Sequence, residues 1–123
     1  RLYPLRHRHG YLAGKPGGAI VTCAVPEGNA MLPPACDSGL NAIRYFMMEE
    51  WMTFVGSVKI LGNVPCVWCE LEDSCKMSAV KMIYGPNATS ETVEVQRFEM
   101  QPQVVDAAKK LGSAIAALLR SKN

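Results

Sequence analysis

The sequence has few of the features that identify a particular chemistry. No apolar run approaches the roughly 20 residues that a membrane-spanning helix needs, so we expect no membrane partner. Only His7 and His9 are histidines, and both flank Arg8, which disfavours a Ser/His/Asp or Cys/His catalytic arrangement. The sequence also lacks a G-x-G-x-x-G segment and a P-loop, so neither common phosphate-binding motif is present.

Charge is sparse and nearly balanced. The 13 Lys and Arg residues face 11 Asp and Glu residues, for a net charge of +2. Arg1, Arg6, Arg8 and Lys15 form a basic stretch without acids, which suits a solvated loop or contact with phosphate or an acidic partner. Nothing in this stretch resembles an aromatic-studded nucleic-acid surface, so we expect no nucleic-acid partner.

Cysteine is the residue type with the most distinctive spacing. Cys66, Cys69 and Cys75 follow the pattern C-x2-C-x5-C, in which thiolates can converge on one soft metal centre. The pattern predicts zinc or an iron–sulfur cluster, and it is also compatible with redox-active or structural thiols or with ordinary packing. Five cysteines cannot all pair within one chain, and the clustering predicts a cytoplasmic protein rather than a secreted disulfide scaffold. The basic first ten residues lack the apolar stretch of a signal peptide.

Apolar periodicity predicts strands and helices in alternation. A run rich in β-branched residues over 19–25 is typical of a strand buried on both faces, and the glycines before it predict a loop. Apolar residues at helical spacing predict an amphipathic helix that follows this strand. Residues 54–61 predict a second strand, bounded by Gly62. The apolar stripe predicted for the helix between these two strands comprises Leu40, Ile43, Met47, Trp51 and Phe54.

The second half of the chain is less regular until its end. We interpret residues 62–92 as a functional insertion that carries the cysteines, followed by a short edge strand at Val93 and Val95. Pro102 opens a final helix with an apolar face that reaches Leu119. The order strand, helix, strand, insertion, helix predicts one α/β domain over residues 1–123 with a parallel sheet. We expect this domain to be incomplete at its N-terminus.

The loop after the first strand is the candidate binding site. Ligands of open α/β sheets sit outside the carboxyl ends of the strands, where this loop begins. Its backbone N–H groups, the Thr22 hydroxyl and the Cys23 thiol suit the polar edge of a flat heteroaromatic ring. A plain strand-to-helix connection is the competing interpretation, and Cys36 is expected to be a packed thiol. The predicted cofactor-binding residues are Thr22, Cys23, Ala24, Val25, Pro26, Glu27, Gly28 and Asn29.

Three segments resemble the NAD(P)H-dependent FMN reductase family, which includes the iron–sulfur flavoproteins. Residues 12–22 are similar to its "L-x-GKP-x-x-x-I-x-T" segment at the fourth strand. Residues 51–56 resemble its entry to the fifth strand, and residues 106–116 resemble its final helix, "A-x-x-LG-x-x-IA". The resemblance implies a flavodoxin-like, three-layer αβα fold, of which this chain would be the C-terminal half. It also implies FMN, an NAD(P)H or protein electron donor, and a homo-oligomer.

The resemblance leaves an alternative function open. The first strand and phosphate loop of the family are not in this sequence, so we expect the chain alone to bind FMN poorly. The family's cluster cysteines also lie elsewhere, so any metal at Cys66, Cys69 and Cys75 depends on those thiols alone. The chain is thus predicted to be an FMN-dependent oxidoreductase or electron-transfer flavoprotein with no catalytic residue assigned. The alternative is a non-enzymatic module whose cysteine loop, with structural zinc or redox thiols, mediates assembly.

Overall fold

A computed structural model describes residues 10–29, 32, 35–69, 71 and 74–121. Arg1, Arg6, Arg8 and the two histidines of the predicted basic stretch lie outside these described residues. None of the described helices is both long and apolar enough to cross a bilayer.

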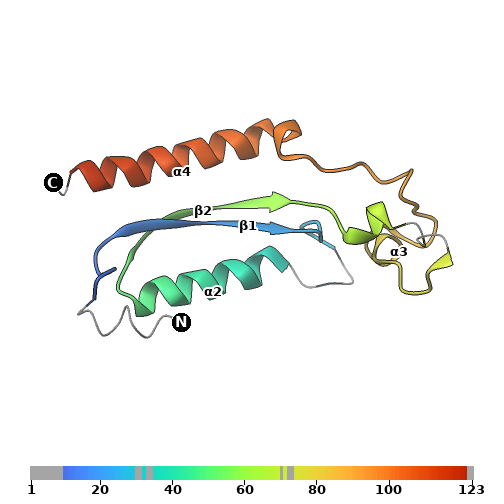
Figure 1. The fold of residues 1–123 in the computed structure, drawn as a ribbon, viewed down its shortest axis with the longest axis horizontal. Helices are drawn as coiled ribbons and strands as arrows, with labels where there is room; N and C mark the ends of the chain where they lie inside the picture. Colours follow the sequence, from blue (N-terminus) through green and yellow to red (C-terminus); the bar gives the residue numbers. More distant parts are fainter. Residues whose placement is uncertain (1–9, 30–31, 33–34, 70, 72–73, 122–123) are drawn as a thin grey trace.

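The centre of the molecule is a two-stranded parallel sheet between two helices. Strand β1 (Pro16–Cys23) pairs with β2 (Thr53–Leu61), and Cys23 lies opposite Leu61 at their carboxyl ends. Helix α2 (Ala35–Glu49) makes the crossover between the strands, and α4 (Pro102–Arg120) covers the other face of the sheet (Figure 1). The predicted element order, the mixed α/β class and the parallel pairing are therefore confirmed.

Strand β1 begins earlier than predicted because its glycines serve the sheet and not a loop. A Cβ atom on Gly18 would lie 2.9 Å from Leu111 Cδ1 and 3.0 Å from the carbonyl oxygen of Gly56. Helix α4 can therefore lie close to the sheet only where these strands lack side chains. The strand also ends at Cys23 rather than at residue 25.

Helix α2 ends before two residues that were assigned to its apolar stripe. Leu40 and Met47 are buried as predicted, but Trp51 is 79% exposed and Phe54 belongs to β2. The helix closes where Met52 N–H donates to the Met47 carbonyl at 2.8 Å, with Trp51 in the left-handed region at a φ of 56°. This geometry is that of a helix C-cap, so backbone termination overrides the continuing apolar period.

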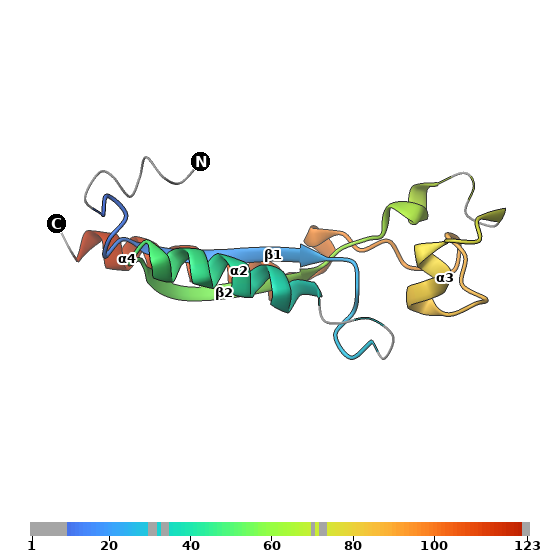
Figure 2. The same cartoon turned by 90° about the horizontal axis from the view of Figure 1, so that it is seen from below.

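A small second cluster lies beyond the carboxyl ends of the strands (Figure 1 and Figure 2). It contains the short helix η1 (Pro65–Trp68) and α3 (Ala79–Tyr84). The buried side chains at its centre are Val64, Val67 and Val80. The predicted insertion over residues 62–92 thus has secondary structure and a core of its own.

The predicted edge strand at Val93 and Val95 is wrong. Both residues lie in irregular chain and pack against the second cluster instead. The Asn63 side chain replaces a strand partner here, because it both donates to the Gln96 carbonyl and accepts from the Gln96 N–H, each at 2.7 Å. After this contact, the short 3-10 helix η3 (Phe98–Met100) leads into α4.

The close approach at Gly18 can be tested by adding a methyl group. Gly18→Ala should lower the free energy of unfolding by about 1–3 kcal/mol, because Leu111 and the neighbouring strand leave no room. Gly112→Ala is the matched control, since its Cβ would meet nothing within 4 Å and alanine favours the helix by about 1 kcal/mol. Urea unfolding followed by circular dichroism measures both. Equal effects of the two substitutions would contradict this account of the packing.

Candidate functional site at the strand ends

A pocket opens at the carboxyl ends of both strands, where the sequence predicted the binding site. Its volume is about 270 Å³, somewhat below the range of roughly 300–1,000 Å³ that is usual for small-molecule sites. The wall combines apolar side chains with a lysine, a carboxylate, an amide and two sulfur atoms. The lining residues are Cys23, Val25, Pro26, Glu27, Cys36, Lys59, Ile60, Leu61 and Gln101.

Some residues of the predicted binding loop line this pocket, and the others do not. Cys23, Val25, Pro26 and Glu27 line the pocket, whereas the exposed Thr22 does not. Only the middle of the predicted segment therefore faces this space.

The remaining loop residues hold the loop in place. Ala24 packs on the second cluster, and Gly28 adopts a φ of 81°. The Asn29 side chain donates to the Ile83 carbonyl at 3.2 Å and accepts from the N–H of Leu32 at 3.0 Å. The amide of Asn29 thus ties the end of the loop to α3, a contact that has no signal in local sequence.

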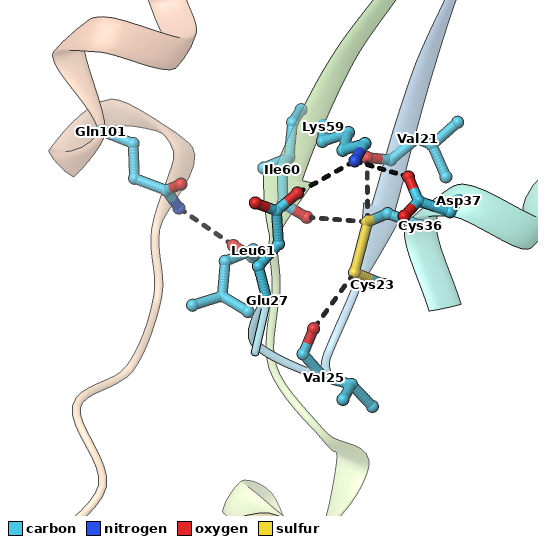
Figure 3. The surroundings of a disulfide bond; sticks show 10 residues. All are labelled: Val21, Cys23, Val25, Glu27, Cys36, Asp37, Lys59, Ile60, Leu61 and Gln101. Atoms are coloured by element: carbon cyan, nitrogen blue, oxygen red, sulfur yellow. Dashed lines mark hydrogen bonds and ion pairs between the residues drawn. A yellow bond between two sulfur atoms is a disulfide. The ribbon is translucent and has the colours of Figure 1, made fainter. Parts of the chain in front are cut away.

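A disulfide between Cys23 and Cys36 forms one side of the pocket (Figure 3). It links the end of β1 to the start of α2, and the two Cα atoms are 5.5 Å apart. Two sequence expectations are therefore wrong: Cys23 offers no thiol here, and Cys36 is not a packed free thiol. The parallel crossover explains the pairing, because it brings the start of the helix beside the end of the strand that precedes it.

An ion-pair group lies beside the disulfide (Figure 3). The Lys59 Nζ atom is 3.0 Å from Glu27 Oε1 and 2.5 Å from Asp37 Oδ1. Hydrogen bonds to Asp37 and then to Glu27 raise the pKa of Lys59 above its ordinary value of 10.5. These two ion pairs join the loop, through Glu27, and α2, through Asp37, to Lys59 on β2.

Lys59, Ile60, Leu61 and Gln101 are pocket residues that sequence reasoning missed. Gln101 precedes α4 and donates from Nε2 to the Leu61 carbonyl at 3.0 Å. The parallel pairing could have indicated the end of β2, because the carboxyl ends of parallel strands share one edge. Nothing in the local sequence around Gln101 could have placed it there.

The second predicted site, at Cys66, Cys69 and Cys75, contains three free thiols. Cys66 Sγ accepts a hydrogen bond from Ala79 N–H at 3.4 Å, and Cys69 is exposed. Within the described part of the chain, no three His, Cys, Asp or Glu side chains are grouped so that they could hold a metal ion. Metal binding at these three thiols therefore stays a prediction from their spacing.

Comparison with known proteins identifies no relative of the chain. No protein-family model, curated protein or solved structure matches the chain.

The raised pKa of Lys59 predicts that its ion pairs stabilise the fold at neutral pH and cease to do so at strongly alkaline pH. A pKa that is higher in the folded than in the unfolded chain adds stability below the unfolded value. This stability is lost as the pH rises through the folded value. Wild type should therefore exceed Lys59→Met in thermal stability at neutral pH, and the gap should shrink above pH 10.5.

Melting curves between neutral and strongly alkaline pH measure that gap. Lys76→Met is the control, because Lys76 is exposed and has no described ion pair. A gap for Lys59→Met that does not change with pH would show that these ion pairs add nothing to stability.

Proposed function

We propose that the chain belongs to a flavodoxin-like oxidoreductase or electron-transfer protein of the NAD(P)H-dependent FMN reductase type. In this proposal the carboxyl edge of the sheet borders the ring of FMN, at the loop from Val25 to Glu27. The observation that carries the proposal is the position of the pocket, which opens at the ends of two parallel strands flanked by helices. Open α/β sheets bind their ligands at this edge.

The lining of the pocket suits one edge of a flat ring better than a whole coenzyme. Val25, Pro26 and Leu61 offer apolar surface, and Lys59 and Gln101 offer polar groups nearby. A volume of about 270 Å³ holds part of an isoalloxazine ring and leaves the rest of FMN outside. FMN would supply the hydride or electron transfer. The residues of this chain would contact the ring and keep water from that edge.

The other components of the prediction have less support. The zinc-binding or thiol-redox alternative depends on the three clustered cysteines, which the described residues do not assemble into a metal site. An NAD(P)H or protein donor and self-association remain predictions that come from the resemblance alone.

Comparison of two flavins tests the proposed ring contact directly. We expect the full chain to quench the fluorescence of riboflavin and of FMN with weak affinities that agree within about threefold, less than 1 kcal/mol. The reason is that the sequence has no P-loop or G-x-G-x-x-G motif to bind the phosphate that distinguishes them.

A pair of variants locates the contact. Val25→Phe should abolish flavin quenching, because the larger side chain fills the pocket. Thr22→Ala is the matched control and should leave quenching unchanged, since Thr22 is exposed and outside the pocket. Absence of quenching by either flavin, or quenching that Val25→Phe leaves intact, would refute ring binding at this pocket.

A further inference from the structure

We propose that Cys23 and Cys36 form a reversible redox centre that exchanges electrons with a dithiol. The first observation is the unequal exposure of the two cysteines. Cys36 is 4% exposed, whereas Cys23 is half-buried at the tip of β1. Both line the same pocket, so an incoming thiolate has a path to the disulfide and meets Cys23 first.

The second observation is that both sulfurs have carbonyl groups placed for the reduced state. Cys23 Sγ is 3.5 Å from the Val25 carbonyl oxygen. Cys36 Sγ is 3.8 Å from the Val21 oxygen and 4.0 Å from the Ile60 oxygen. A disulfide has no S–H to donate, whereas two thiols would each find an acceptor within reach of a sulfur hydrogen bond (Figure 3). Reduction therefore leaves no buried donor without a partner.

The third observation is the position of Cys36 in the first turn of α2. The N-terminus of a helix favours negative charge, so a thiolate that leaves from Cys36 is stabilised. When a thiolate attacks Cys23, Cys36 is therefore the favoured leaving group. The half-buried Cys23 sulfur receives the nucleophile, and the buried Cys36 sulfur receives the charge.

The exchange then proceeds in two steps. A thiolate of the reductant attacks Cys23 Sγ, the Cys23–Cys36 bond breaks, and its electron pair goes to Cys36, which takes up a proton. The second thiolate of the reductant attacks the sulfur that the first has bonded to Cys23, and Cys23 leaves and is protonated. In total, two electrons and two protons pass to the protein, and the dithiol becomes a disulfide.

The fold has other contacts that keep these elements together after reduction. Glu27 and Asp37 still reach Lys59, and the Asn29 side chain still donates to Ile83. The loop and the start of α2 are thus held by contacts that do not involve sulfur. We therefore expect the fold to persist when the disulfide is reduced.

Differential alkylation of the native full chain tests the proposal without flavin. The protein is incubated with dithiothreitol, alkylated before and after denaturation with light and heavy iodoacetamide, and mapped by mass spectrometry. We expect Cys23 to gain the light label and the buried Cys36 to gain the heavy label only after dithiothreitol treatment, with an unchanged far-ultraviolet circular dichroism spectrum. Oxidised dithiothreitol should restore the disulfide. Cys69, which is exposed and free, is the internal control for labelling in every sample.

Single variants test the order of attack. In Cys36→Ser, Cys23 should react with an aromatic disulfide reagent at least about tenfold faster than Cys36 does in Cys23→Ser, because only Cys23 is accessible. Equal rates would refute the assigned roles. Resistance to dithiothreitol until the chain unfolds, or loss of the fold on reduction, would show a structural disulfide and overturn the proposal. Because flavin takes no part in these measurements, their outcome is independent of the proposed ring binding.

Discussion

The structure depends on the parallel pairing of β1 and β2. Two parallel strands need a crossover, and here α2 returns across one face of the sheet. The crossover places the start of α2 beside the end of β1, which brings Cys36 to Cys23 and Asp37 to Lys59. The pocket, the disulfide and the ion-pair group are therefore consequences of one pairing.

The second constraint is the close packing of α4. It approaches the sheet over Gly18 and Gly56, and its Leu111 side chain occupies the space that other residues would fill. The segment before α4 then brings Gln101 to the end of β2. The same packing that closes the far face of the sheet thus completes the wall of the pocket.

The two cysteine groups differ in their spacing along the chain and in their state in the structure. Cys66, Cys69 and Cys75 are close in sequence, yet the described residues place no metal-binding group there. Cys23 and Cys36 are 13 positions apart and form the disulfide. The end of a strand and the start of the next helix converge when a crossover joins them, so distant cysteines can meet there.

Periodicity alone was enough to predict both strands, both long helices and the α/β class, because burial of one face leaves a local pattern in the chain. The same local pattern failed at Trp51, where the backbone ended the helix. It also failed at Val95, because the next residue, Gln96, pairs with the Asn63 amide and not with a strand. The loop from Val25 to Glu27 was predicted at the pocket, since its position follows from strand order. Its partners from β2, α2 and the start of α4 depend on contacts between distant segments, and only the folded chain brings these together.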